Sequence, residues 1–578
     1  MMSLSKTSAT VPVRSRWSAD NIFFPLVALL VALLVIYPMV WLVVGSFRSA
    51  SPLQPGDWTI ANYLRGYSDP SIPKAIWNTL VFALGQTIVG MVIGTLLAWV
   101  IARTNVPWRA MLEFLTLVLF LLPSIVMVVA WTLLLSPSRG FINNFAVSWF
   151  ALDQAPFNIY GLTGMILVQG LSSVPFAYLI MAPAFAAVDL SLEEAARMSG
   201  SGRWQTFLRI TLPMARPAIA AATVLLFIGG IEAFDVPQLL GAPKGIYTFT
   251  ALIFHEIRVR QPSDYGAATA LAMGLQFAAL LCMVLYRRAS RMNARFETVK
   301  GKGYRVGTID LGPARWWVLA GWLAFFLIAI VLPLLATLIV SLVPFFSGLS
   351  ADMFNDMTLS NYQRLLNHPS LRRGVVNSAI LAIVAAAICV ALAAAIAFLV
   401  ARKSSGHAWL LDTLAMLPIC LPATVLGIGL VWAYITLPLP IYGTVLLLGI
   451  AYVTRYIPLA LRTTVAGVSQ ISRELEEAST ISGARALGTF VHIVLPLIRV
   501  TLFAAWVILV MIFFREFSMS ILLAGPSNPV LSVVLYDYYE AAEIGPLCAA
   551  SLLLIALTTL VVFAAQRVLG VTTRAATR

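Results

Sequence analysis

Long apolar runs, each near the length of a bilayer crossing, recur along the whole chain and are separated by short polar segments. A bilayer core about 30 Å thick requires roughly 20 apolar residues per helical crossing, so the pattern predicts about twelve spans. The runs lack the strict alternation of a membrane β-barrel, and their backbone groups must therefore be satisfied inside helices. We expect an all-α polytopic membrane protein. The predicted spans are 22–46, 76–101, 111–135, 159–187, 212–237, 264–286, 316–344, 375–400, 408–434, 443–467, 497–523 and 544–566.

Charge is scarce and unevenly placed on this apolar background. Of 578 residues, 60% are hydrophobic and 11% are charged, a balance far from that of soluble globular domains. The formal net charge is +14, and basic residues gather before the first apolar run and in segment 287–315. Positively charged segments stay on the cytoplasmic side of a membrane, so both chain ends are expected there, beside membrane lipid rather than nucleic acid. The first run is too long for a signal-peptide core and is expected to remain as a span.

The sequence repeats itself once. Shifting it by 299 residues aligns Asn78 with Asn377, and further along the shift falls to 283 because the first copy has a longer loop. The chain therefore divides into two six-span units, 1–300 and 301–578. Because six is even, both units enter the membrane from the same side. We expect parallel repeats related by an axis along the membrane normal, with a pathway where they meet.

Each unit interrupts its apolar runs with a charged, helix-forming stretch, at about 190–213 and about 473–496. Ser191 and Glu194 have the spacing of a capping box that can start a helix, and Gly200 can end it with left-handed backbone. We expect a helical hairpin at both places, facing the cytoplasm, with an acidic front that fits a groove on another protein. The matched positions are Glu193, Glu194, Ala195 and Gly200 in the first copy and Glu476, Glu477, Ala478 and Gly483 in the second.

These stretches resemble the cytoplasmic coupling loop of the permeases of binding-protein-dependent ATP-binding-cassette importers. That loop reads E-A-A, three residues, G, about nine residues, then I-x-L-P. The first copy has E-A-A at 194–196 and I-T-L-P at 210–213; the second has E-A-S at 477–479 and I-V-L-P at 493–496, so Ser479 replaces a small residue. Two permease units in one chain look most like the ferric-iron and thiamine branch of this family.

The resemblance implies a type I importer fold in a bacterial cytoplasmic (inner) membrane and a division of labour among subunits. Each loop is expected to dock on one subunit of a homodimeric ATPase, which drives alternating access, while a periplasmic binding protein delivers the solute. The sequence has no G-x-x-x-x-G-K-[ST] phosphate loop, so ATP and Mg²⁺ are expected on the partner ATPase. We expect this chain to be a transport subunit and not an enzyme, with no cofactor or metal of its own.

Two ionisable residues late in the fifth span of each unit are candidates for the pathway or a gate: Glu232 and Asp235 in the first unit, and Arg515 and Glu516 in the second. Ionisable groups inside spans are costly, and by default they mark a pathway or a pair. Glu232 aligns with Arg515 across the repeat, so an ion pair near the axis is expected either to form a gate, to line the path, or only to lock the units together. Arg455 and Arg462 in the tenth span are interpreted as residues at a helix end.

The sequence says less about the solute. Carboxylate oxygens such as that of Glu516 suit hard Fe(III), which makes ferric iron the leading hypothesis. Thiamine or another small organic solute, such as a polyamine or an organophosphonate, is the alternative within the same architecture. An ion-coupled secondary transporter with parallel six-span repeats also explains the composition and the repeat, but it does not explain two coupling loops.

Overall fold

The computed structural model describes residues 19–293, 308–346, 348, 352–402 and 406–569. Within these ranges the regular elements are helices, apart from two isolated bridges. The basic positions expected to mark the cytoplasmic side at 1–18, at 294–307 and at 570–578 lie outside the described residues.

The predicted spans are confirmed as helices, with four of them sharply bent. Eight single spans are long and apolar enough to cross a membrane, and four bent pairs bring the number to as many as twelve. The single spans are α1 (Ala19–Ser46), α3 (Ile72–Arg103), α7 (Leu162–Ala186), α13 (Tyr265–Asn293), α14 (Ala314–Phe326) continued by α15 (Leu332–Ser341), α17 (Pro369–Ile380) continued by α18 (Ala386–Arg402), α21 (Val445–Ser469) and α28 (Ile544–Leu569).

The third span of each half is broken in the middle, which the continuous apolar runs 111–135 and 408–434 do not reveal. α4 (Arg109–Leu121) turns by 98° into α5 (Ser124–Leu135), and α19 (Gly406–Met416) with the 3₁₀ turn η8 (Leu417–Cys420) turns by 109° into α20 (Ala423–Ile435). Pro123 and Pro422 cause both breaks, because proline lacks an N–H group and forces the preceding residue into extended backbone.

The fifth spans are bent where they leave the hairpins. α11 (Arg216–Glu232) and α25 (Arg499–Phe514) follow short helices at angles of 73° and 75°. These preceding pieces are α9 (Arg203–Thr206) and α10 (Leu212–Met214) in the first half, and α23 (Ala486–Thr489) and α24 (Leu495–Leu497) in the second.

The first span of each half packs against the other half. α1 packs against α20 of the second half, and α15 packs reciprocally against α5 of the first half. The Tyr37 hydroxyl donates a hydrogen bond to the Ala433 carbonyl oxygen at 3.0 Å across this contact. Each broken span is thus covered by the first span of the other half, and the central residues of α5 and α20 are buried.

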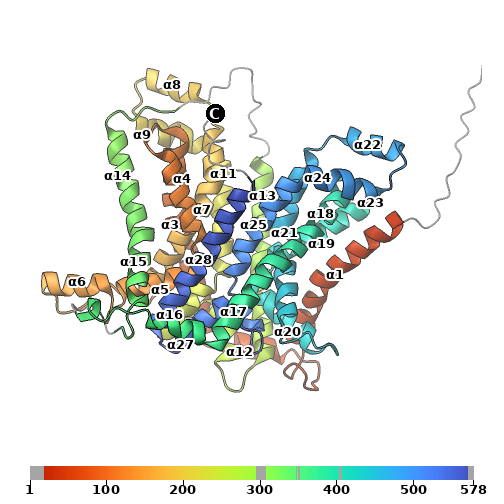
Figure 1. Ribbon diagram of the computed structural model, residues 1–578, viewed down its shortest axis with the longest axis horizontal. Coiled ribbons are helices and arrows are strands. Elements are labelled where there is room, and N and C mark those ends of the chain that lie inside the picture. The colour runs from red at the N-terminus through yellow and green to blue at the C-terminus, as the bar shows by residue number, and fades with distance from the viewer. Residues whose placement is uncertain (1–18, 294–307, 347, 349–351, 403–405, 570–578) are drawn as a thin grey trace, which may run out of the picture.

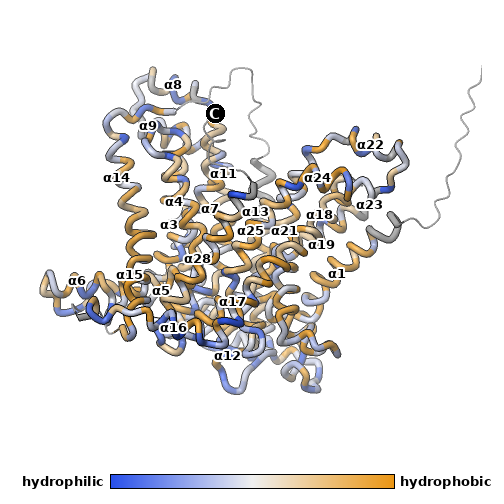
Figure 2. Tube along the Cα trace, viewed as in Figure 1, coloured by the Kyte–Doolittle hydropathy of each residue, from blue (hydrophilic) through white to orange (hydrophobic). Residues whose placement is uncertain are grey.

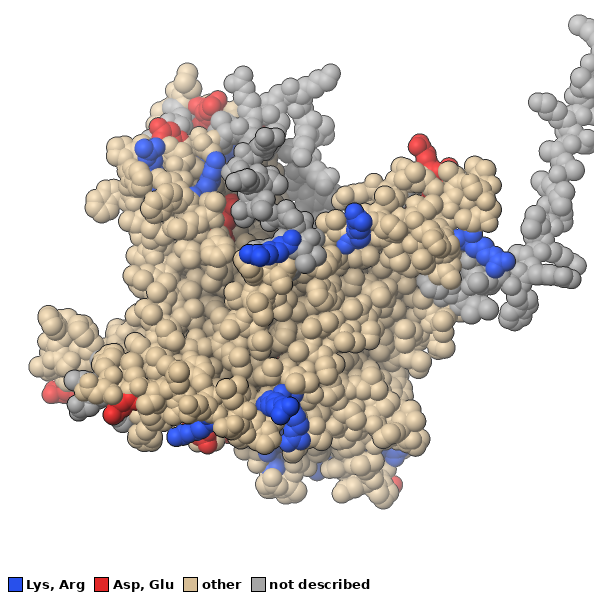
Figure 3. Space-filling view, viewed as in Figure 1, with Lys and Arg blue, Asp and Glu red and all other residues tan. Residues whose placement is uncertain are grey.

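Short helices that do not cross the membrane lie at the two ends of the molecule (Figure 1). One end, here named the hairpin end, carries α8 (Leu190–Met198) and α22 (Arg473–Ile481). The opposite end carries α6 (Phe141–Phe150), α12 (Phe249–Arg258), α16 (Ser360–Asn367) and α27 (Leu531–Glu540). Figure 2 shows apolar residues along the helices between the ends, and Figure 3 shows that charged side chains on the visible face gather at the two ends. This distribution fits a bilayer around the middle of the bundle.

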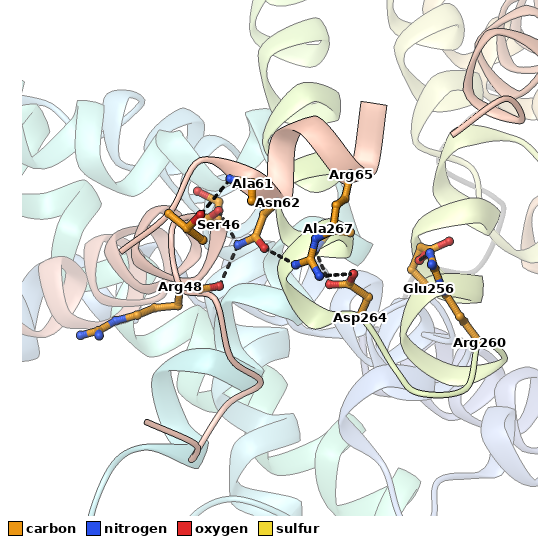
Figure 4. A network of polar contacts seen from close by, with 10 residues as sticks. Ser46, Arg48, Ala61, Asn62, Arg65, Glu256, Arg260, Asp264 and Ala267 are labelled. Atoms are coloured by element: carbon orange, nitrogen blue, oxygen red, sulfur yellow. Dashed lines mark hydrogen bonds and ion pairs between the residues drawn. The ribbon is translucent and has the colours of Figure 1, made fainter. Parts of the chain in front are cut away.

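A polar network fixes the place where α1 ends (Figure 4). The Asn62 side-chain amide, in α2 (Ala61–Tyr67), donates to the carbonyl oxygens of Ser46 at 3.0 Å and Arg48 at 2.7 Å. Arg65 donates to the Asn62 side-chain oxygen at 2.6 Å and lies 3.5 Å from the Asp264 carboxylate beside α13.

The same device recurs in the second half, where Asn361 donates to the carbonyl oxygens of Ser341 at 3.0 Å and Val343 at 2.8 Å. Asn78 and Asn377 also make equivalent bonds, to the Tyr247 carbonyl oxygen at 3.0 Å and the Pro529 carbonyl oxygen at 2.8 Å. The internal repeat therefore holds at the level of individual hydrogen bonds.

Candidate functional site: the coupling hairpins and the polar layer

The two hairpins turn in the same way. Gly200 and Gly483 have φ angles of +85° and +84°, a left-handed conformation that glycine adopts without strain. After the first turn the Ser201 N–H donates to the Ala196 carbonyl oxygen at 3.0 Å, and after the second the Ala484 N–H donates to the Ser479 carbonyl oxygen at 3.0 Å. These bonds are typical of a glycine C-cap, so the predicted helix ends are confirmed.

The predicted start of the first hairpin helix is wrong in detail. α8 begins at Leu190, and the Asp189 carboxylate accepts a hydrogen bond from the Ser191 N–H at 2.9 Å. Asp189 therefore caps the helix in place of the capping box expected from Ser191. An aspartate at this position also satisfies a free N–H group and complements the positive end of the helix dipole.

Glu193 is turned into the protein and does not face a partner. Its carboxylate lies 2.6 Å from the Arg103 guanidinium, both side chains are 1% exposed, and the Thr211 hydroxyl donates to its second oxygen at 2.6 Å. Arg103, at the end of α3, also donates to the Val188 carbonyl oxygen at 3.0 Å. Glu193 thus fastens the hairpin to the second span. The sequence held a signal for this role, because an arginine recurs at equivalent positions of the two halves, as Arg103 and Arg402.

The remaining predicted coupling residues lie on the outer surface of the hairpins. Glu194, Ala195, Glu477 and Ala478 are exposed, whereas Glu476, at the position equivalent to the buried Glu193, is half-buried. Large apolar side chains protrude at matching positions of both hairpins: Leu192 (44% exposed) and Met198 (90%) in the first, Leu475 (48%) and Ile481 (87%) in the second. An exposed apolar surface rimmed by carboxylates is typical of a protein interface.

The central polar layer is the set of charged and hydroxyl side chains where the fifth spans meet between the halves. Its first contact differs from the expected one, because the Glu232 carboxylate pairs with Arg455 at 2.9 Å and not with Arg515. Arg455 lies well inside α21, so its interpretation as a helix-end residue is wrong. Arg462, by contrast, is 55% exposed and lies 3.5 Å from Asp412. A charge in the middle of a span is the signal that points to Arg455.

Arg515 reaches into the first half. Its guanidinium donates to the Phe120 carbonyl oxygen at 2.6 Å and lies 5.0 Å from the centre of the Phe120 ring. Phe120 is near the end of α4, beside the break of the third span. The expected pair of Glu232 with Arg515 is therefore replaced by two separate contacts, each made by an arginine of the second half.

Asp235 marks the axis between the halves. The Ser518 hydroxyl donates to its carboxylate at 2.8 Å, and the Ser124 hydroxyl at the start of α5 donates to the other carboxylate oxygen. Asp235 and Ser518 occupy equivalent positions of the repeat. Two equivalent residues can touch only at the pseudo-twofold axis, so this contact locates the axis in the polar layer.

Glu516 is held within the second half. Its carboxylate accepts hydrogen bonds from the Tyr456 hydroxyl and from the Met519 N–H, the latter at 3.2 Å. The Ser520 and Ser532 hydroxyls donate to its backbone carbonyl oxygen at 3.0 Å and 2.6 Å. Tyr456 was not identified from the sequence, where no charge or spacing distinguishes it from other aromatic residues in the spans.

An aromatic layer adjoins the polar layer and follows the same symmetry. Phe234 and Phe517, equivalent in the repeat, stack with ring centres 5.7 Å apart. Phe254 and Tyr536, each the sixth residue of its helix in α12 and α27, are 6.5 Å apart, and they contact Phe234 at 5.2 Å and Phe517 at 5.4 Å respectively. All four rings are buried. The axis is therefore filled by aromatic side chains next to the charged groups.

Two six-span halves that meet in a polar and an aromatic layer, with a matching exposed hairpin on each at one end, are the architecture of a membrane permease. The chain belongs to the family described as binding-protein-dependent transport system inner membrane components, which matches residues 90–296 and 388–574. These two matches cover more than half of the chain, and one lies in each half. It is thus a permease of an importer that works with an ATPase and a binding protein, and the family assignment removes the secondary-transporter alternative.

Several known proteins are similar to this chain. The ferric transport system permease protein FbpB of Actinobacillus pleuropneumoniae is 26% identical over 550 residues, covering 93% of this chain and 76% of the relative. The spermidine/putrescine transport system permease protein PotB of Escherichia coli is 29% identical over 238 residues, covering 41% of this chain and 84% of the relative. A crystal structure of a bacterial ABC transporter involved in alginate import aligns with 48% of this chain and 96% of that chain, at 24% identity and a TM-score of 0.40.

Proposed function

We propose that this chain is the permease of an ATP-driven importer for ferric iron. In this proposal a periplasmic binding protein delivers the solute, and alternating access of the two halves carries it to the cytoplasm. The chain lies in the bacterial cytoplasmic membrane with the hairpin end and both chain ends in the cytoplasm. The similarity to a ferric transport permease over 93% of the chain is the observation that carries the choice of solute.

The matching hairpins support the coupling part of the proposal. Each presents the same exposed surface, including Leu192 and Met198 in the first and Leu475 and Ile481 in the second, to one subunit of a homodimeric ATPase. Glu194, Ala195, Glu477 and Ala478 rim these surfaces, and Gly200 and Gly483 set their shape. Glu193 contributes from inside by fastening α8 to Arg103.

The polar and aromatic layers support a pathway between residues 1–300 and residues 301–578, the two units of the proposal. Glu232, Asp235, Arg515 and Glu516 supply charge near the axis, and the four aromatic rings close it. Charged groups near the axis of a membrane protein serve a translocation path more readily than they serve stability, because burial of charge is costly.

The first experiment separates the permease from the ATPase. The purified chain should hydrolyse no ATP, since the sequence offers docking surfaces and no phosphate loop. Addition of the partner ATPase should produce hydrolysis, and addition of the loaded binding protein should stimulate it. Robust hydrolysis by the isolated chain would overturn the proposal.

The second experiment tests the solute. Cells that carry the complete transporter should accumulate radioactive iron in an ATP-dependent way, and excess thiamine or spermidine should leave that uptake unchanged. Inhibition by either compound favours the alternative of a small organic solute. The similarity to the spermidine/putrescine permease PotB makes spermidine the more important competitor.

A further inference from the structure

The breaks in the third spans leave backbone carbonyl groups without a partner inside their own helix. Such groups need a protein donor, because the membrane interior supplies no water. In both halves an arginine supplies it. Arg515 donates to the Phe120 carbonyl oxygen at 2.6 Å, and Arg455 donates to the Leu421 carbonyl oxygen. Arg455 also donates to the Pro418 carbonyl oxygen at 3.0 Å, which accepts a second hydrogen bond from the Leu421 N–H at 3.1 Å. The negative end of a helix dipole adds to the attraction in both places.

The two halves reach this arrangement with different residues. Arg515 extends from the end of α25 to the break in the opposite half. Its equivalent in the repeat, Glu232, extends from the end of α11 toward the opposite half in the same way, but a carboxylate cannot donate to a carbonyl group. Arg455 stands between Glu232 and the second break, and its own equivalent in the first half is Ser172.

We propose that Arg455 is a positioning residue that holds the second broken span in place, and that Glu232 serves to hold Arg455 there. The pair replaces the single arginine that serves the first half. Glu232 then acts as an orienting group for Arg455 and is not a lock that joins the halves by charge alone. This role concerns the backbone of one span and is independent of the solute, whereas its effect on uptake rests on the proposed function.

Cys420 provides a native reporter at the second break. It is the last residue of η8, it is 8% exposed, and its carbonyl oxygen accepts a hydrogen bond from Gln276 at 2.9 Å. A full-length chain that keeps Cys420 as its single thiol, with Cys282→Ser, Cys389→Ala and Cys548→Ser, reports opening of the break as the rate of alkylation by N-ethylmaleimide in membranes.

Loss of the cap should open the break. Arg455→Ser, whose hydroxyl is too short to reach the break, and Arg455→Met, which has no donor, are expected to raise the alkylation rate about tenfold, the ratio that corresponds to a buried hydrogen bond of about 1.4 kcal/mol. Arg455→Lys should stay near the parent rate because an ammonium group still donates. Glu232→Gln should lie between them, since Arg455 keeps its carbonyl partners and loses only its counter-charge. Parent rates in Arg455→Met would overturn the capping role.

The decisive variant copies the first half. Glu232→Arg combined with Arg455→Ser recreates the residues of the first half, an arginine at the position of Arg515 and a serine at the position of Ser172. It should return the alkylation rate close to that of the parent although it contains no ion pair. If the ion pair itself held the halves together, the double variant would be alkylated as fast as Arg455→Ser, and that result would contradict the proposed roles of Arg455 and Glu232.

Two controls separate local opening from unfolding. Arg462→Gln removes an exposed arginine from the same helix α21 and should leave the rate unchanged. The same variants with Cys548 as the single thiol report on α28, where that side chain is fully buried, and should remain unreactive. If the local reporter behaves as expected while iron uptake is absent even in the parent, the proposed solute is wrong and the capping role stands.

Discussion

Equivalent residues of the two halves are alike at the hairpin end of this protein and different in its polar layer. At the hairpin end the halves agree closely: the glycine turns have φ angles within one degree, and exposed apolar residues recur at the same positions. In the polar layer the equivalents differ in charge, with Glu232 opposite Arg515 and Asp235 opposite Ser518. In each half the hairpin comes directly before the fifth span and the charged residues lie at the end of that span. The two regions are therefore close in sequence, and their difference needs another explanation.

This contrast follows from what each region meets under the proposed function. Two identical ATPase subunits present identical grooves, and they favour two identical hairpins. A solute crosses one central axis, where a charge of one sign from both halves would place like charges side by side at high cost. Complementary or neutral partners at equivalent positions, such as Asp235 with Ser518, avoid that repulsion. Under the proposed function, the two halves therefore keep the same residues where each meets its own ATPase subunit. They differ where both line the single central path.

The largest expected effect concerns the attachment of the first hairpin. Glu193→Ala leaves Arg103 buried without its carboxylate partner, at a cost of about 3–5 kcal/mol. We expect the first hairpin to lose its position and the assembly with the ATPase to fail, measured by co-purification of the two subunits from membranes.

The exposed neighbour Glu194 supplies the matched control. Glu194→Gln removes the same charge from the adjacent position and should retain assembly, with at most a small loss of affinity. If Glu193→Ala co-purified as well as Glu194→Gln, the fastening role of Glu193 would be wrong, and the hairpin would hold its shape by its own helices and turn.

The next effect tests the asymmetry at the axis. Asp235→Ser makes the equivalent positions identical and removes two hydrogen bonds to a charged group, worth about 1.5–3 kcal/mol each. Uptake should fall strongly at equal amounts of protein in the membrane. The exchange Asp235→Ser with Ser518→Asp should recover part of the loss, because the carboxylate stays at the axis, although Ser124 loses its partner.

Recovery is the informative outcome of this exchange. A carboxylate that is needed on the axis, whichever half supplies it, predicts recovery above the single variant. If the double variant transported no better than Asp235→Ser, the charge would be needed at its contact with Ser124, and the symmetry of the axis would not matter.

The sequence predicted the fold well, since it supplied the repeat and the length of the apolar runs. Twelve spans, the two halves and both hairpins all follow from pattern and spacing. The breaks at Pro123 and Pro422 were missed because a proline does not by itself break a span: α7 holds Pro175 and Pro183 and remains a single helix. High hydropathy does not distinguish a helix that faces lipid from one that is buried in protein, and α5 and α20 are buried in protein.

The polar layer was predicted in its members and not in its contacts. Glu232, Asp235 and Arg515 do contact residues of the other half, as charges within spans suggested, whereas Glu516 is held within the second half. The choice of partner depends on the three-dimensional path of the third spans, and those paths bring carbonyl groups toward Arg515 and Arg455. Alignment of Glu232 with Arg515 shows that the positions are equivalent, which does not require that they touch.

A smaller effect tests the symmetry of the turns. Gly200→Val and Gly483→Val force a β-branched residue into left-handed backbone, at a cost of about 1–2 kcal/mol. No atom lies within 4 Å of the added Cβ at either site, so the strain is confined to the backbone. Binding-protein-stimulated ATP hydrolysis should fall by similar factors in the two variants, while both chains still insert into the membrane. A large difference between the two would mean that the ATPase subunits use the hairpins unequally.

The smallest expected effect concerns the one difference within the aromatic layer. Tyr536→Phe makes this position identical to Phe254 and removes the hydrogen bond from the Gln238 amide to the Tyr536 hydroxyl, 3.2 Å long and worth about 0.5–1.5 kcal/mol. The ring and its contacts with Phe517 and Phe254 remain, so iron uptake should change by less than about threefold, in proportion to the lower part of that range. Tyr536→Ala removes the ring itself and should open a leak, measured as accumulation of radioactive iron in cells depleted of ATP. If Tyr536→Phe leaked as much as Tyr536→Ala, the hydroxyl would be part of the closure, and the asymmetry at the axis would extend from the polar layer into the aromatic layer.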